Sequence, residues 1–327
     1  MSKLVTIFGG SGFVGRYVAR RMAKAGWRVR VACRRPNEAL FVRPYGAVGQ
    51  VEPILCNIRS EASVAAALAG ADAVVNCVGI LAEAGKNRFD AIQAEGAARV
   101  ARLAKAAGVQ RLVQISAIGA DAGSASAYGR SKAAGEAAVA EAFPGAVILR
   151  PSIIFGPEDQ FFNRFASMSR FGPVLPLVGA ETKFQPVFVE DVAAAAAQAV
   201  LTGVPGGVYE LGGPEVMTFR QMMQLMLKTI NRRRLIVDMP RPVAGLMAGV
   251  LDGVQAVTGG LLANGTLTRD QLKNLGHDNT VSAGARGFEV FGIVPATAGS
   301  ILPSYLWRFR PSGQYDAIKA SAKNLRA

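Results

Sequence analysis

The first half of the chain alternates short apolar runs with longer amphipathic or alanine-rich stretches. The short runs are rich in β-branched residues or alternate polar and apolar positions, which is typical of strands. The longer stretches have the length and the 3.6-residue periodicity of helices. The expected strands are 3–8, 27–34, 51–57, 72–79, 111–119 and 146–156, and the expected helices are 16–26, 60–70, 89–108 and 127–143. This alternation predicts an α/β fold with a doubly wound, mostly parallel sheet.

A glycine-rich turn, GGSGFVG, separates the first expected strand from the first expected helix. Gly9 permits a tight turn, Gly12 lets the backbone approach a pyrophosphate, and Gly15 allows close packing of the helix. The exposed N–H groups of the helix N-terminus then face the phosphates. The alternative is a glycine-rich turn without a ligand. In its strand–turn–helix context the motif predicts a Rossmann dinucleotide site that includes Gly9, Gly10, Ser11, Gly12, Phe13, Val14 and Gly15.

The end of the second expected strand indicates which dinucleotide binds. An NAD site has a carboxylate at this point, about 20 residues after the glycines, for the ribose 2′-hydroxyl. This chain has Arg34 and Arg35 there and no carboxylate until Glu38. Two guanidinium groups suit a 2′-phosphate, to which each can donate two hydrogen bonds. The alternative is a solvated surface pair, but the pattern favours NADP(H).

Composition limits the class of protein. Half of the 327 residues are hydrophobic and 18% are charged, which is typical of a folded globular chain. A formal net charge of +14 indicates an anionic neighbour, such as nucleotide phosphates, acidic lipid or an acidic protein surface. The chain lacks helix-turn-helix and RNP motifs, so we expect no nucleic-acid binding. The single histidine, His277, has no Cys or His partner nearby, and we expect no metal site.

The cysteines and the N-terminus indicate a compartment. Cys33, Cys56 and Cys77 are widely spaced and odd in number, so they do not form a disulfide framework, and a reducing compartment is expected. The start, MSKLVTIFGG, enters a strand without a signal peptide or presequence. No apolar run has the roughly 20 residues of a spanning helix. We therefore expect a soluble or peripheral protein.

The stretch SAYGRSK places Tyr128 and Lys132 four residues apart, on one face of an expected helix. An ammonium group beside a phenol lowers the pKa of the phenol, and the lysine can also hold the ribose hydroxyls of the nicotinamide nucleotide. A Tyr-x-x-x-Lys pair arises often by chance. On the helix after the fifth strand of a dinucleotide fold it indicates either a reductase site or a clamp for a cofactor.

Across about residues 1–230 the chain resembles an extended or atypical short-chain dehydrogenase/reductase. The resemblance rests on motifs that occur in the same order as in the family: GGSGFVG, Asn57-Ile58, NCVG (76–79), YGRSK (128–132) and RPSIIFGP (150–157). The resemblance implies cofactor contacts from Asn57, Ile58, Cys77, Val78, Gly79, Ser116, Tyr128, Lys132, Pro151, Ser152 and Ile153. The family also uses a hydroxyl near the end of the fifth strand, where this chain has Ala117. Ser116 stands one place earlier, and because adjacent strand residues point to opposite faces, the register leaves open whether its hydroxyl reaches a substrate.

A narrower resemblance covers nearly the whole chain. Residues 150–193, together with VRPYGAVGQ (42–50) and LTRDQLKNL (267–275), are similar to the NADPH-binding accessory subunit family of respiratory complex I, the one-alpha subcomplex subunit nine family. This resemblance implies a structural NADP(H) at the junction of the peripheral and membrane arms, near the quinone path. It also implies other complex I subunits as partners. The expected location is peripheral, on the cytoplasmic face of a bacterial inner membrane or the matrix side in a mitochondrial relative.

We expect a Rossmann domain over residues 1–155 and a smaller C-terminal α/β lobe over 156–327, interleaved with the sheet. Within the lobe, residues 231–275 are expected to dock on a partner or membrane. NRRRL (231–235) is basic, and an apolar helical stripe follows at Val243, Leu246, Met247, Val250, Leu251 and Val254. Arg232–Arg234 and Arg241 would then face acidic head groups. The alternative is an ordinary helix packed on its own lobe.

Three functions follow from these patterns. The first is an accessory, largely structural complex I subunit in which Tyr128 and Lys132 clamp a cofactor that is not turned over. The second is a free NADPH-dependent reductase or epimerase, for which quinone biosynthesis is one candidate pathway. The third is a redox-sensing NADP(H)-binding regulator. The specificity of the 150–193 segment favours the first.

Overall fold

The computed structural model describes residues 2–240, 242–243, 245–246, 249 and 269–315. Its centre is a seven-stranded sheet with the order β11-β6-β5-β4-β1-β2-β3, in which every pair of neighbours is parallel. The strands are β1 Leu4–Phe8, β2 Arg28–Cys33, β3 Val51–Leu55, β4 Ala73–Asn76, β5 Arg111–Ile115, β6 Val147–Pro151 and β11 Gly207–Leu211. The predicted parallel Rossmann sheet is confirmed.

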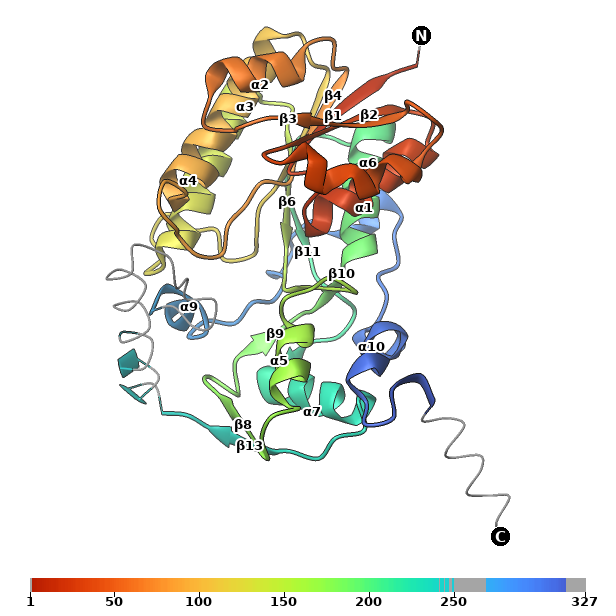
Figure 1. Ribbon diagram of the computed structural model, residues 1–327. Helices are drawn as coiled ribbons and strands as arrows, with labels where there is room; N and C mark the ends of the chain where they lie inside the picture. Colours follow the sequence, from red (N-terminus) through yellow and green to blue (C-terminus); the bar gives the residue numbers. More distant parts are fainter. Residues whose placement is uncertain (1, 241, 244, 247–248, 250–268, 316–327) are drawn as a thin grey trace.

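Helices cover both faces of this sheet (Figure 1). On one face lie α1 (Phe13–Lys24) and α6 (Val189–Thr202), packed on alternate strand residues such as Ile7 and Val75. On the other face lie α2 (Glu61–Leu68), α3 (Glu95–Ala106) and α4 (Ala127–Ala142), packed on Phe8, Val74 and Leu112. Because side chains alternate along a strand and both faces are covered, the central strands β1 and β4 are buried along their whole length.

Two short helical segments flank the candidate site. A 3₁₀ segment, η1 (Pro36–Tyr45), follows β2 and contains the residues next to Arg34 and Arg35. A π-helical segment, η2 (Asp90–Ala94), precedes α3. η1 was not expected from the sequence, whereas η2 and α3 together form the expected helix 89–108, whose first turn is π-helical.

The expected strand 146–156 is wrong as a single element. It forms β6, which ends at Pro151, and a separate β7 (Ile154–Phe155) that pairs with β10 (Val187–Phe188) in a second sheet. The Ser152 N–H still donates to Leu211 O in the large sheet, whereas the carbonyl of Ile153 accepts from Val187 N. The chain therefore changes sheets within three residues, and at this point it leaves the Rossmann core for the lobe.

The C-terminal lobe has its own core beneath the carboxyl end of the large sheet (Figure 1). Phe162, Met222, Met226 and Leu302 are fully buried there. η3 (Phe288–Phe291) packs on the core of the large sheet. The lobe elements are α5 Phe162–Met168, β8 Val174–Leu177, β9 Lys183–Phe184, β12 Met217–Thr218, α7 Phe219–Thr229, β13 Leu235–Asp238, α9 Arg269–Asn274, α10 Ala298–Leu306, η4 Trp307–Phe309 and η5 Gly313–Tyr315. Between them, α6 and β11 return to the large sheet, so lobe and sheet alternate along the chain.

Candidate functional site

The glycine-rich turn forms a tight cradle between β1 and α1. Gly9 has φ +71°, a left-handed conformation that favours glycine, and Gly12 N donates to Gly9 O at 2.9 Å. A Cβ on Gly15 would lie 2.3 Å from Gly9 O, so no larger residue fits without movement. Gly12 caps α1 without a side-chain hydrogen bond, and the first turn of α1 has no acidic residue. The N–H groups of this helix end therefore remain available to an anion.

The structure places Arg34 and Arg35 beside this cradle, but in unequal surroundings. Arg35 Nη1 lies 3.1 Å from Glu38 Oε1, and its side chain is 76% exposed. Arg34 Nη1 donates to Asn87 Oδ1 at 3.4 Å, and among the described residues no carboxylate forms an ion pair with it. Arg34 is therefore the stronger candidate for a 2′-phosphate contact, because its charge is not already compensated.

Two further arginines near the cradle were missed in the sequence. Arg16 directly follows the last glycine, and its guanidinium donates to Gly12 O and Ser11 O and stacks 4.7 Å from the Phe41 ring centroid. Arg59 Nη1 donates to Lys86 O at 2.9 Å, next to the Asn87 that Arg34 contacts. The only signal for Arg16 was its place after GGSGFVG, and Arg59 gave none beyond following Asn57-Ile58.

Residues predicted after β3 and β4 lie at the same edge of the sheet. Asn57 Oδ1 accepts from Arg59 N at 3.1 Å and so shapes the turn after β3, while Ile58 is buried against Gly96. Val78 follows β4 and lies against Gly9, since a Cβ on Gly9 would be 3.2 Å from Val78 Cγ2. Cys77 is half-buried and burial raises the pKa of its thiol to about 12, so it stays a neutral thiol. The carboxyl ends of β3 and β4 therefore border the cradle.

Lys132 reaches from α4 to the gap between the ends of β4 and β5. Its Nζ donates to Ile115 O at 3.4 Å and would lie 3.3 Å from a Cβ on Gly79. The residue is only 7% exposed. Burial lowers the pKa of Lys132 to about 8, and the neighbouring Glu136 and Cys77 oppose that shift. The site therefore holds a poorly solvated ammonium group that can donate hydrogen bonds to a polar ligand.

Tyr128 lies one turn earlier on α4, but its relation to Lys132 differs from the expectation. Lys132 Nζ lies 5.9 Å from the centroid of the Tyr128 ring, over its face, and the Phe89 ring packs edge-on at 5.9 Å. Burial raises the pKa of Tyr128 to about 12. The expectation that the lysine lowers this pKa is wrong here, because burial of the phenol outweighs an ammonium group that faces the ring.

Two buried polar atoms near Lys132 have no hydrogen-bond partner among the described residues: Ser116 Oγ and Gln93 Oε1. A Cβ on Gly79 would lie 3.8 Å from Gln93 Oε1, which places the amide next to the lysine. Leu112 of β5 faces α2, α3 and α4. Side chains alternate along a strand, and Ser116 is four residues after Leu112, so the Ser116 side chain points to the same side. Buried polar groups are normally paired. The residues therefore fit a ligand with hydroxyl and amide groups, such as the nicotinamide end of a dinucleotide.

Of the cofactor contacts predicted at the end of β6, Pro151 and Ser152 are buried and Ile153 is half-buried. The Ser152 hydroxyl lies 2.8 Å from Asn279 O and 2.7 Å from Asn279 Oδ1, and it accepts from Gln185 N. This hydroxyl is thus occupied by contacts within the protein.

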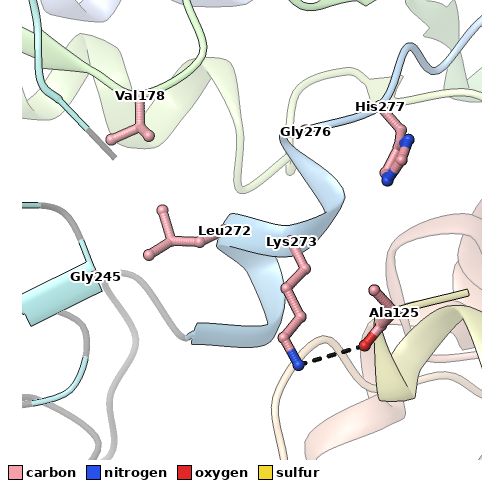
Figure 2. A pocket seen from close by; sticks show the side chains of 7 residues that line it. All are labelled: Ala125, Val178, Gly245, Leu272, Lys273, Gly276 and His277. Carbon is pink, nitrogen blue, oxygen red and sulfur yellow. Dashed lines mark hydrogen bonds between the residues drawn. The ribbon is translucent and has the colours of Figure 1, made fainter. Parts of the chain in front are cut away.

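Residues 270–279, which we call the strap, cross this end of the site. Asp270 accepts hydrogen bonds from Ser126 Oγ, Ala127 N and Tyr128 N at the start of α4. Figure 2 shows Lys273, whose Nζ donates to Ala125 O at 3.3 Å, and His277, which lines the same hollow. This hollow, of about 650 Å³, is bounded by Ala125, Val178, Gly245, Leu272, Lys273, Gly276 and His277. None of its lining residues is a predicted dinucleotide contact, so it is separate from the cradle.

Other kinds of site gain no support from the described part of the chain. No three of its His, Cys, Asp or Glu side chains gather closely enough to hold a metal ion. None of its helices combines the length and the hydropathy that crossing a bilayer requires.

Solved structures resemble this fold at low sequence identity. The structure of gox2253 matches with a TM-score of 0.70 and 20% identity, over 96% of this chain and 99% of that one. The NADPH-dependent quinone oxidoreductase QOR2 from Escherichia coli, complexed with NADPH, matches with a TM-score of 0.69 and 18% identity, over 92% and 99%. At these identities the likeness shows the fold alone.

Sequence relatives are more specific. The model of the NAD dependent epimerase/dehydratase family matches residues 5–212. The Arabidopsis thaliana NADH dehydrogenase (ubiquinone) 1 alpha subcomplex subunit 9, a mitochondrial protein, is 35% identical over 316 residues, 95% of this chain and 79% of that protein. The mitochondrial NADH-ubiquinone oxidoreductase 40 kDa subunit of Neurospora crassa is 29% identical over 322 residues, 98% and 83% of the two chains. This chain therefore belongs to the NAD dependent epimerase/dehydratase family and, within it, to the family of complex I 1 alpha subcomplex subunit 9.

Proposed function

We propose that this chain is an accessory subunit of respiratory complex I that binds NADP(H) tightly as a structural ligand. The observation that carries the proposal is similarity to complex I subunits along nearly the whole chain, lobe included. We further propose that it lies at the junction of the peripheral and membrane arms and supports assembly near the quinone path. In a bacterium this would be the cytoplasmic face of the inner membrane.

The cradle and its rim support the choice of cofactor. The N-terminus of α1 would hold the pyrophosphate, Arg34 the 2′-phosphate, and Lys132 with Ser116 and Gln93 the nicotinamide nucleotide. Bound NADPH would supply a hydride donor. A tyrosine whose pKa is about 12 gives up its proton less readily than one at the ordinary value of 10, so Tyr128 is a weaker proton donor than a reductase would use. With Ala117 at the usual hydroxyl position, these features support a clamp rather than a turnover site.

One observation favours a second candidate, a free NADPH-dependent reductase. A Ceramide reductase of Caulobacter vibrioides is 33% identical over 191 residues, 58% of this chain and 59% of that protein. Tyr128 and Lys132 retain the spacing that such chemistry uses. The partial span of this match ranks the reductase below the complex I subunit.

We also propose a docking surface on the lobe, which we call the basic ribbon. It consists of the outer face of β8 and β13, where Val174 pairs with Leu235 and Pro176 with Val237, and these four residues are exposed. The opposite face, with Leu175, Leu177 and Ile236, packs on the lobe core. A two-stranded ribbon that is apolar on both faces usually has its outer face covered by a binding partner or a membrane.

Cations lie at one end of this apolar face, where the two parallel strands begin: Arg170, Arg232, Arg233 and Arg234, next to Phe171, which is 85% exposed. None of the four arginines forms an ion pair with a described carboxylate. Burial lowers the pKa of Arg232, and repulsion from Arg234 and Arg170 adds to this. Exposed aliphatic and aromatic groups beside uncompensated cations suit a membrane surface with acidic head groups.

The predicted apolar stripe adds little to this surface. Val243 and Leu246 are exposed, Leu246 at 74%. Met247, Val250, Leu251 and Val254, together with Arg241, lie outside the described residues. The stripe therefore stays a prediction.

The purified protein should carry NADP(H) rather than NAD(H). Charge-assisted bonds to a 2′-phosphate contribute roughly 1.5–3 kcal/mol each, so Arg34→Ala should weaken NADPH binding by at least about tenfold and leave NADH binding unchanged. Arg35→Ala should have a smaller effect, because Glu38 already compensates Arg35. Arg28→Ala, at the opposite end of β2, is the control. Nucleotide extraction that yields mainly NAD would contradict the choice of cofactor.

Lys132 should matter more than Tyr128 for cofactor retention. Lys132→Ala removes the buried ammonium group and should release NADP(H) and weaken the assembled complex. Tyr128→Phe should leave NADH:quinone turnover of that complex close to normal. The measurements are bound nucleotide per chain, migration with complex I, and NADPH oxidation by the isolated protein against ketones, aldehydes and quinones. Steady turnover that Tyr128→Phe reduces by about 10²-fold or more would instead establish the reductase.

The stability of the cofactor-free protein should depend on pH through Lys132. Below pH 8 its ammonium is protonated in both states, and burying it costs stability. Between the folded pKa of about 8 and the ordinary value of 10.5, the unfolded chain binds this proton and the folded protein does not. The contribution of Lys132 therefore rises with pH in this window. Lys132→Met should be more stable than wild type at pH 7 in urea unfolding, with an advantage that narrows toward pH 10.5. A difference that is constant with pH would show that burial does not shift this pKa.

The basic ribbon should bind acidic vesicles. Leu235→Asp with Val237→Asp changes exposed side chains, so the protein should stay folded and cofactor-loaded. It should no longer sediment with vesicles that contain phosphatidylglycerol, and it should lose migration with complex I. Val48→Asp, on the Rossmann domain, is the matched control. If the wild-type protein does not bind these vesicles but the double variant still fails to migrate with complex I, the basic ribbon contacts a protein and the lipid proposal is wrong.

A further inference from the structure

Asp270 is the hydrogen-bonding partner of the N-terminus of α4, although 142 residues separate it from Tyr128. Its Oδ2 accepts from Ser126 Oγ at 2.6 Å and from Tyr128 N at 3.1 Å, and its Oδ1 accepts from Ala127 N at 2.7 Å. Two of these donors are first-turn N–H groups, which no backbone acceptor within the helix can reach. The carboxylate thus completes the end of the helix that carries Tyr128 and Lys132.

The local sequence caps this helix weakly by comparison. Ser126 is the N-cap residue, and its Oγ accepts from Gly129 N at 3.4 Å, near the limit of a hydrogen bond. Asp270 adds two shorter acceptor contacts and places a negative charge at the positive end of the helix dipole. Tyr128 is the second residue of α4, so the order of this first turn depends on a side chain from the C-terminal lobe.

The other end of the strap holds two more elements of the site. Asn279 contacts the Ser152 hydroxyl after β6, and its Nδ2 donates to Ile118 O after β5, at 3.1 Å. Between the two ends, Thr182 Oγ1 donates to Leu275 O at 2.6 Å. The strap is therefore fixed to α4 and to the segments that follow β5 and β6, each of which contains predicted cofactor contacts.

We propose that Asp270 is a positioning residue that couples NADP(H) binding to the seating of the strap. The proposal rests on the proposed function only in its assumption that the cradle takes NADP(H). Seating of the carboxylate orders the first turn of α4, which presets Tyr128 and Lys132 for the nicotinamide nucleotide. Bound cofactor in turn favours the conformation of α4 that Asp270 caps. Residues 270–275, the end of the predicted docking segment that lies in the strap, thereby sense whether the cofactor site is filled.

Thermodynamic linkage makes this coupling measurable from both sides. If the seated strap raises the affinity for NADPH, NADPH must stabilise the seated strap by the same factor. Couplings between linked sites are typically about fivefold or more. Asp270→Ala should therefore weaken NADPH binding by at least about fivefold, without removing any residue that is expected to touch the cofactor.

The experiment combines NADPH titration with hydrogen exchange of the full-length protein. In wild type, saturating NADPH should slow amide exchange in peptides that cover residues 126–130 and 269–279. In Asp270→Ala the slowing over 269–279 should disappear while that at the glycine-rich turn persists. Asp270→Asn tests the same point with side-chain volume retained, since an amide cannot accept at both positions.

Asp278→Ala is the matched control, because Asp278 Oδ1 accepts from Lys183 N in the same stretch and does not touch α4. It should bind NADPH like wild type. The coupling is overturned if Asp270→Ala and Asp270→Asn both bind NADPH with wild-type affinity, or if NADPH leaves exchange over 269–279 unchanged in wild type. NADPH binding without migration with complex I would refute the proposed subunit role and leave the coupling standing. A wild type that binds no dinucleotide would refute both.

Discussion

The burial of one ammonium group, that of Lys132, constrains much of this structure. A buried cation is costly unless charged partners compensate it. Glu136, one turn along α4, raises the pKa of Lys132, and it accepts from Arg150 of β6 at 2.6 Å. Arg150 in turn lies 3.6 Å from Glu210 of β11, whose Oε2 accepts from Ser282 N. Two cations and two anions thus alternate from α4 across the sheet edge to the segment after the strap.

We infer that this chain of charges acts mainly by setting the register of α4 against β6 and β11, and less by adding stability to the fold. Buried ion pairs return little net free energy, but removal of one partner leaves an uncompensated charge. The position of α4 sets Tyr128 at the first turn, and Asp270 supplies the acceptors which that turn lacks. The same C-terminal stretch therefore meets α4 through Asp270 and β11 through Ser282. Sheet and lobe are therefore joined by specific polar contacts as well as by apolar packing, since Phe188 packs against both apolar cores.

The sequence predicted those features that depend on neighbours along the chain. Strand–helix alternation, the conformation of Gly9, the contact of Gly15 with the turn and the placement of Arg34 all follow from local periodicity or spacing. Features set by distant residues were missed or mistaken. Burial, not the adjacent lysine, decides the pKa of Tyr128. The break between β6 and β7 depends on pairing with β10, and no local pattern links Asp270 to Ser126 or Asn279 to Ser152. Glu38 pairs with Arg35 three residues away, yet only geometry shows that Arg34 is left without a carboxylate.

The residues of a reductase site are present here, which suggests turnover, but the strap lies across that site, which suggests that the cofactor is only held. A turnover enzyme must admit a substrate to the nicotinamide end and move a proton there. Here that end is crossed by the strap, which bonds to the start of α4 and to Ser152. The phenol has its pKa raised by burial, and Ala117 follows Ser116 where a hydroxyl is usual. Each of these features slows exchange or chemistry, whereas none weakens the phosphate cradle. These features support the proposal that the chain holds its cofactor without turning it over, and the lobe that carries the strap is the part also proposed to dock.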